Sequence, residues 1–251
     1  TNEDVRVDGV INNSSTQNAG NVVLISSADD VIVSGNGALN GDINNSTTGG
    51  NGGSITIIAA DDAVVDGSLD NSSTGIAGNI TVVGTDGSAN IGNNGFAALA
   101  INNSTTGGNG GNITFSASGT NETVLIDGSI DNTATGSGGN INLTSAAGRV
   151  DLIDSSALVA NINNSNTGGT GGSIIISAGG TAFPIKRVAT DARPSGNTKL
   201  SGRPWSRASS RTLSSRACVP SCHTYTALVV DTVGARPSSS YMRECWVLRR
   251  R

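Results

Sequence analysis

Two pairs of adjacent aspartates are the residues whose type and spacing come closest to metal chemistry. Asp29 and Asp30, and likewise Asp61 and Asp62, lie just before a short β-branched run at matching places in a repeated pattern. Carboxylates supply the hard oxygen ligands that Ca²⁺ prefers. Later connections depart from the pattern, with Asp86, Glu122 and Arg149 in the corresponding places. The repeated Gly-Gly-x-Gly-x-Asp nonapeptide of Ca²⁺-binding β-rolls is also missing. We interpret the four aspartates as solvated turn acids and keep a structural calcium site as the alternative.

Acid–base catalysis on a polysaccharide would need clustered acids, or a basic residue that breaks the repeat at one place. Residues 1–183 contain no His, Lys, Cys, Trp or Tyr, so such roles would fall to Asp and Glu alone. Aromatic residues that could stack on sugars are scarce, with Phe96 and Phe115 as the candidates, and Phe115 belongs to an expected core position. The sequence therefore predicts no catalytic residue and no cofactor. A carbohydrate-active β-helix enzyme stays as the alternative function.

Asparagine recurs at one position of every repeat, always as the second member of an Asn/Asp-Asn pair. In stacked coils, these amides would lie above one another, where each can both donate and accept a hydrogen bond. We expect a structural ladder rather than a ligand site from Asn13, Asn45, Asn71, Asn103, Asn132 and Asn164.

The repeat that carries these residues occurs six times in the first 183 residues. Its copies begin at Ile11, Ile43, Leu69, Ile101, Ile130 and Ile162, with spacings of 32, 26, 32, 29 and 32 residues. A unit of this kind cannot bury its own apolar face, so its copies must stack. The spacing predicts an all-β fold, a parallel β-helix (β-solenoid) of about six coils over residues 1–183.

Each copy also contains a segment in which aliphatic residues alternate with other residues, as a strand with one buried face requires. The expected core pairs are Val22 and Leu24, Ile55 and Ile57, Ile80 and Val82, Ile113 and Phe115, Ile141 and Leu143, and Ile174 and Ile176. A third segment follows, for example at residues 31–33 and 124–126. The connections at 47–53 and 105–111, TTGGNGG, are too rich in glycine to pack by side chains, and we expect exposed turns there.

The beginning of the chain resembles the end of a further coil, because Asp8-Gly9 precedes Ile11 as Asp66-Gly67 precedes Leu69. An uncapped solenoid end presents unpaired strand edges, which are templates for association. We therefore expect end-to-end self-association. No apolar run approaches the ~18 residues of a membrane-spanning helix, so no membrane span is predicted.

Residues 184–251 differ in composition from the repeats. They hold 13 of the 15 Lys and Arg residues, all five Pro, all three Cys and the only His. We expect a basic, Arg/Ser/Pro-rich tail of low order, of the kind a shifted reading frame produces, with 226–233 (TALVVDTV) as its one strand candidate. The spacing of Cys218, Cys222, His223 and Cys245 is not a recurrent zinc pattern. Arginine favours electrostatic contact with polyanions, but no specific nucleic-acid site is predicted.

The segments GGNGGNITF, GGNGGSITI and VDGSLDNSST resemble the coils of filamentous haemagglutinin-like large exoproteins, the β-helical adhesins of bacterial two-partner secretion systems. The resemblance covers about residues 1–183. It implies a right-handed parallel β-helix, export to the cell surface or the extracellular space, and a role in adhesion or surface structure. The secretion domain of that family has no counterpart in this sequence.

Together these observations predict a non-enzymatic, secreted or cell-surface adhesin or structural segment that binds through the loops and faces of its solenoid. Its expected partner is a glycan or protein on a host or neighbouring cell.

Overall fold

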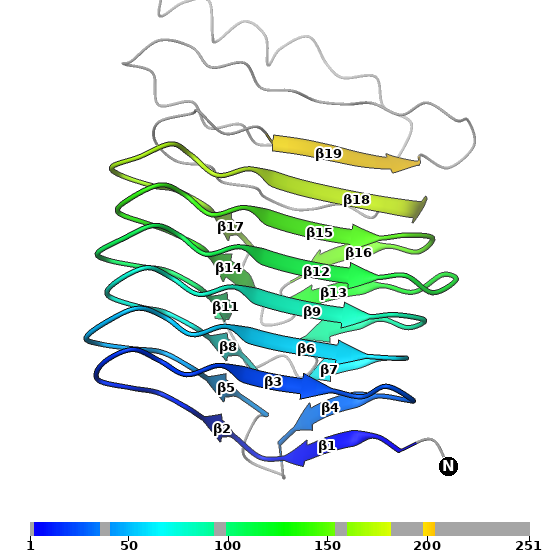
Figure 1. The fold of residues 1–251 in the computed structure, drawn as a ribbon. Helices are drawn as coiled ribbons and strands as arrows, with labels where there is room; N and C mark the ends of the chain where they lie inside the picture. Colours follow the sequence, from blue (N-terminus) through cyan, green and yellow to red (C-terminus); the bar gives the residue numbers. More distant parts are fainter. Residues whose placement is uncertain (1–2, 36–40, 93–98, 154–159, 182–197, 204–251) are drawn as a thin grey trace, which may run out of the picture.

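The computed structural model of the protein describes residues 3–35, 41–92, 99–153, 160–181 and 198–203. These residues form parallel strands that are stacked in three sheets. The described part of the chain contains strands and turns and no helix, and therefore no helix that could cross a membrane. Each coil contributes one strand to each sheet, and the coils rise from β1–β3 to β16–β18 (Figure 1). This arrangement confirms the predicted parallel β-helix of about six coils.

The first sheet has six strands, each from the third apolar segment of the repeat. They are β1 (Val5–Asp8), β4 (Val31–Ser34), β7 (Ala63–Val65), β10 (Ala89–Ile91), β13 (Val124–Asp127) and β16 (Val150–Ile153). The second sheet is narrower because it holds the Ile/Leu-Asn/Asp doublets. Its strands are β2 (Ile11–Asn12), β5 (Ile43–Asn44), β8 (Leu69–Asp70), β11 (Leu99–Asn102), β14 (Ser129–Asp131) and β17 (Ile162–Asn163).

The third sheet contains the alternating segments of the repeat. Its strands are β3 (Val22–Ile25), β6 (Ile55–Ala59), β9 (Ile80–Gly84), β12 (Ile113–Ala117), β15 (Ile141–Ser145), β18 (Ile174–Thr181) and β19 (Thr198–Arg203). β19 lies within the predicted low-order tail, and no strand was predicted there, because TKLSGR has one large aliphatic residue and no alternation. Backbone pairing with β18 places this strand in the sheet. The cysteines, His223 and residues 226–233 lie outside the described residues.

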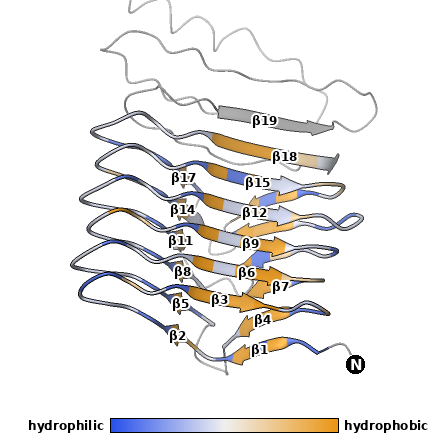
Figure 2. Ribbon diagram, viewed as in Figure 1, coloured by the Kyte–Doolittle hydropathy of each residue, from blue (hydrophilic) through white to orange (hydrophobic). Residues whose placement is uncertain are grey.

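Matching residues of successive coils are paired in register. Ile55 is aligned with Ile80, Ile80 with Ile113, and Ile113 with Ile141, although about thirty residues separate each pair in the chain. The doublet residues align in the same way, from Ile11 with Ile43 to Ile130 with Ile162. The alternation of residues along each strand places the aliphatic members inside, where they are buried. Figure 2 shows hydrophobic residues in the strands of all three sheets.

The interior is a continuous aliphatic column. Of the expected core pairs, all members from β6 to β18 are buried, with exposed fractions of 4% or less, and Phe115 is completely buried. The first coil differs, because Val5, Val7, Ile11 and Leu24 are only partly buried. The core is therefore closed along its length and open at its first coil.

Candidate functional site

A group of acidic residues lies at the corner between the third and the first sheet. The register of β1, β4 and β7 aligns the residues that precede them, so Asp4, Asp30 and Asp62 stack in one column. Ser88 and Thr123 continue this column before β10 and β13. Asp4 was not among the predicted aspartates, although it precedes Val5 as Asp30 precedes Val31.

Side chains of this column accept hydrogen bonds from the backbone of the next coil. Asp30 Oδ1 accepts from the Asp62 amide at 2.9 Å, and Asp62 Oδ1 accepts from the Ser88 amide at 2.6 Å. Ser88 Oγ accepts from the Thr123 amide at 3.1 Å and donates to Glu122 Oε2 at 2.6 Å. These side chains satisfy turn amides that would otherwise lack an intramolecular partner. Asp30 and Asp62 therefore have a structural role at the corner.

The corner also concentrates negative charge. Carboxylate oxygens of Asp4, Asp29 and Asp30 lie within 4.8 Å of one another. Partial desolvation raises the pKa of Asp61 above its ordinary value, and the negative charges of Asp62, Asp30, Asp29 and Glu122 raise it further. The structure thus gathers the four predicted aspartates at one corner, but the tightest group contains Asp4 and not Asp61 or Asp62. Solvated turn acids stay the prediction for this corner, and a calcium site stays the alternative.

The asparagine column runs beside the second sheet in the interior. Each Nδ2 donates to the Oδ1 of the next coil, at 2.7 Å from Asn13 to Asn45 and at 2.8 Å from Asn45 to Asn71. The bonds continue at 2.9 Å from Asn71 to Asn103, 2.9 Å from Asn103 to Asn132 and 2.8 Å from Asn132 to Asn164. At the last coil, Asn164 Nδ2 donates to the Gly139 carbonyl at 3.0 Å. The four middle amides, Asn45, Asn71, Asn103 and Asn132, are completely buried.

The first member of each doublet has a different role. Asn44 Oδ1 accepts from the Ser46 amide at 3.1 Å, and Asp70 Oδ1 accepts from the Ser72 amide at 3.1 Å. Such a bond to a residue two positions on is an Asx turn, which Asn and Asp both form. This explains why the first position tolerates Asp while the second is always Asn: a carboxylate can accept but cannot extend a chain of donors and acceptors.

The glycine-rich connections at 47–53 and 105–111 were expected to be exposed turns, and this prediction is wrong for part of each connection. Gly53 and Gly111 are buried, and Thr47 and Thr105 are each 3% exposed. A Cβ atom at Gly111 would overlap the carbonyl oxygen of Gly78 in the coil before it. Glycine is required here because the backbones of successive coils are in direct contact, which composition alone did not reveal.

One further carboxylate lies on the outer side of the first sheet. Asp151 is aligned with Leu125 of the preceding coil, and Leu125 is aligned with Asn90 of the coil before that. Asp151 Oδ2 lies 3.3 Å from Arg149 Nη2, and burial raises the pKa of Asp151 more strongly than Arg149 lowers it. The burial and the raised pKa of Asp151 were not predictable, because the alternation of β16 predicts an outward, solvated position for this residue.

Comparisons with known proteins found no relatives. No protein-family model matches the chain, and neither a search of curated proteins nor a search of solved structures gives a match.

Proposed function

We propose that this chain is a non-enzymatic adhesin or structural segment, secreted or held at a cell surface, whose solenoid displays binding groups at regular intervals. The observation that supports this most directly is uniformity: the asparagine column joins all six coils by the same bond. Enzymes of β-helical architecture need a place where the repeat is interrupted by reactive groups. The resemblance of the coil segments to exported β-helical adhesins supports the same function and the extracellular location.

The outer face of the third sheet is the surface best suited to binding. The register aligns Thr56, Thr81 and Thr114 along it, and Asn142 follows in the same column. The neighbouring column has Ser116 aligned with Thr144. All of these side chains are partly exposed. Hydroxyl and amide groups both donate and accept hydrogen bonds, as sugar hydroxyls do, so a cell-surface glycan matches this face chemically.

The binding test uses a panel of bacterial and host polysaccharides and the full 251-residue chain. We expect saturable binding that falls at least threefold in the double variant Thr81→Val, Thr114→Val, which keeps side-chain shape and removes two hydroxyls. The control is Thr48→Val with Thr106→Val, which removes two exposed hydroxyls from the glycine-rich turns. Absence of binding to every polysaccharide and to intact cells would contradict adhesion.

The second candidate is a carbohydrate-active enzyme, for which the carboxylates gathered at the acidic corner, Asp61 and Glu122 among them, would supply the general acid and base. Incubation with acidic and neutral polysaccharides, followed by measurement of reducing ends, separates the two functions. A display segment releases none. Sustained release of reducing ends that is lost in Asp61→Asn and in Glu122→Gln, while both variants keep the circular dichroism spectrum of the parent, would favour the enzyme over the adhesin.

A further inference from the structure

A second asparagine column lies on the outside of the solenoid, where the strands of the third sheet begin. The strand register places its members, one per coil, above one another. They are the residues directly before β3, β6, β9, β12, β15 and β18, namely Asn21, Ser54, Asn79, Asn112, Asn140 and Ser173. We call this set the outer asparagine column. Asn79, Asn112 and Asn140, in three successive coils, are all exposed.

The side-chain oxygens of the outer asparagine column are bonded to the next coil. Asn79 Oδ1 accepts a hydrogen bond from the Asn112 amide at 2.9 Å, and Asn112 Oδ1 accepts one from the Asn140 amide at 2.9 Å. Asn140 Oδ1 accepts from the Ser173 amide, also at 2.9 Å. Because oxygen and nitrogen belong to one planar amide, each of these bonds also restricts the direction in which Nδ2 points.

The side-chain nitrogens of this column are used differently from those of the interior column. In the interior, Asn71 Nδ2 donates to Asn103 Oδ1. Outside, Nδ2 of Asn79 and of Asn112 makes no hydrogen bond within the part of the chain that the structure describes. Each Nδ2 carries two N–H donors. With the oxygens occupied, the column presents donors alone, one group per coil at a spacing of ~4.8 Å. A ligand for it must therefore supply acceptors.

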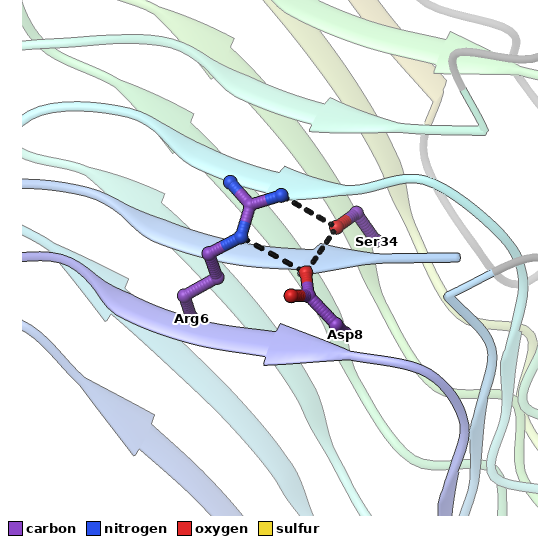
Figure 3. Close-up of polar contacts among 3 residues, drawn as sticks. All are labelled: Arg6, Asp8 and Ser34. Atoms are coloured by element: carbon purple, nitrogen blue, oxygen red, sulfur yellow. Dashed lines mark hydrogen bonds and ion pairs between the residues drawn. The ribbon is translucent and has the colours of Figure 1, made fainter. Parts of the chain in front are cut away.

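The third sheet adds no charge to this row of donors. Its six strands from β3 to β18 contain no Asp, Glu, Lys or Arg. The first sheet differs, because Arg6 Nε lies 2.9 Å from Asp8 Oδ1, and Ser34 Oγ donates to the same carboxylate at 3.1 Å (Figure 3). A face without positive charge offers an anionic ligand no ion pair. The outer face of the third sheet therefore suits an uncharged ligand.

The turns at the other end of these strands are acidic. Asp61 and Asp62 follow β6, Asp86 follows β9, and Glu122 follows β12. Residues 1–183 hold 16 of the 19 acidic residues and only two of the 15 basic ones. A carboxylated or sulfated glycan on the third sheet would be repelled by these charges, most strongly at low ionic strength. Charge therefore favours neutral over acidic glycans on this face.

We propose that the outer asparagine column extends the glycan-binding face and selects neutral glycans that carry acetamido groups. This inference rests on the proposed adhesive function and names the ligand class of the same face. The carbonyl oxygen of an acetamido group accepts hydrogen bonds and has no proton to place, so it matches a donor-only Nδ2 better than a hydroxyl does. Thr81 and Thr114, two residues after Asn79 and Asn112 on the same face of the strands, offer hydroxyls to the rest of the sugar.

Three soluble glycans separate the contribution of the acetamido group from that of charge. N-acetylated chitohexaose has an acetamido group on every sugar, cellohexaose has a hydroxyl in each of those places, and a hyaluronan oligosaccharide combines acetamido groups with carboxylates. In isothermal titration calorimetry with the full chain, we expect chitohexaose to bind roughly fivefold or more tightly than cellohexaose, because acetamido carbonyls accept from Nδ2. Hyaluronan should bind more weakly than chitohexaose at low salt, and this difference should narrow in 0.5 M NaCl.

Serine removes the donors of this column and keeps its bonds to the backbone, because serine is already one of its members. Ser54 Oγ accepts from the Asn79 amide at 3.3 Å. The double variant Asn79→Ser, Asn112→Ser should therefore keep the contacts between coils and lose both Nδ2 groups. We expect its affinity for chitohexaose to fall about fivefold or more, to the level of cellohexaose, while its circular dichroism spectrum stays that of the parent.

The matched control makes the same substitution in the glycine-rich turns. Asn51 Oδ1 and Asn109 Oδ1 accept from the amides of Ile76 and Ser137, both at 2.9 Å, so these exposed asparagines are bonded to the next coil in the same way. They precede the strands of the third sheet and do not belong to its outer face. Asn51→Ser with Asn109→Ser should leave the affinity for chitohexaose unchanged.

The outcomes distinguish this inference from the function on which it rests. Equal effects of the two double variants, equal affinities of the parent for chitohexaose and cellohexaose, or tighter binding of hyaluronan would overturn the selection of neutral acetamido glycans and leave adhesion standing. Binding to another polysaccharide that depends on Thr81 and Thr114 but not on Asn79 and Asn112 would do the same. Absence of binding to every glycan and to intact cells would overturn both.

Discussion

The interior asparagine column and the exterior acidic corner are built by the same repetition, yet they behave differently. In the asparagine column, each amide donates to one neighbour and accepts from the other, so stacking identical residues satisfies both ends. At the acidic corner, stacked carboxylates can only accept, so Asp30 and Asp62 bond to backbone amides and their charges accumulate. A repeated side chain that can both donate and accept a hydrogen bond links the coils of a solenoid to one another. A repeated carboxylate can only accept, so its stacking adds negative charge to the surface.

The largest expected effect comes from breaking the asparagine column in its middle. Asn103→Ala would leave Asn71 Nδ2 and Asn132 Oδ1 buried without their partners. At ~1–3 kcal/mol for each unsatisfied buried group, we expect a loss of about 3–4 kcal/mol of unfolding free energy, measured by urea denaturation. Asn13→Ala is the matched variant in the first coil, where the partly exposed Asn13 amide makes a single bond of the column and only Asn45 Oδ1 would lose its partner, so the cost should be about half as large, ~1–2 kcal/mol. Equal losses of unfolding free energy in the two variants would mean that the two middle bonds contribute no more than the single bond at the first coil.

A second substitution tests whether close contact between coils sustains the column. Gly111→Ala would force a methyl group onto the carbonyl of Gly78, and overpacking of this kind costs about 3 kcal/mol. Gly20 occupies the same column in the first coil, where an added Cβ would lie 3.2 Å from Asn13 Nδ2 and meet no preceding coil. Gly20→Ala should therefore change the urea midpoint far less than Gly111→Ala. A Gly111→Ala variant as stable as the parent would contradict the coil spacing.

At the acidic corner, the effect should be smaller and opposite in sign. Asp61→Asn removes a charge that its neighbours disfavour, so we expect a slight rise in melting temperature at pH 7 and low salt. Because the pKa of Asp61 is raised in the folded state, protonation favours folding. The advantage of the variant should shrink as the pH falls through this raised pKa. It should also shrink in 0.5 M NaCl, because Asp61 is exposed and its interactions are screened. An advantage that grows in acid would contradict this assignment.

Calcium gives the smallest expected effect. If the corner holds only solvated acids, 2 mM CaCl₂ and NaCl of equal ionic strength should raise the melting temperature alike, and a chelator should have no effect. A calcium-specific rise that disappears in Asp4→Asn and in Asp29→Asn would establish the alternative and make the corner a metal site.

The columns were predictable from the sequence because their spacing is regular. The markers Ile11 to Ile162 gave the register of the second sheet, and the alternation around Ile55 and Ile113 gave the buried face of the third. The contacts between columns were not predictable in the same way. Asp4 lies outside the paired aspartates, and the backbone contacts of Gly111 depend on the distance between coils. β19 pairs through backbone atoms whose position no side-chain pattern encodes.

The most direct test of the stacked architecture is a distance between two residues that are far apart in sequence and aligned in one column. Thr56 and Ile175 are joined by the successive pairs to Thr81, Thr114 and Asn142, so four strand spacings of ~4.8 Å place them about 19 Å apart. Spin labels at these two positions, with the three cysteines replaced by serine, should give a narrow pulsed EPR distribution near that value. A broad distribution centred beyond about 30 Å would show that coils separated by some thirty residues do not stack in register.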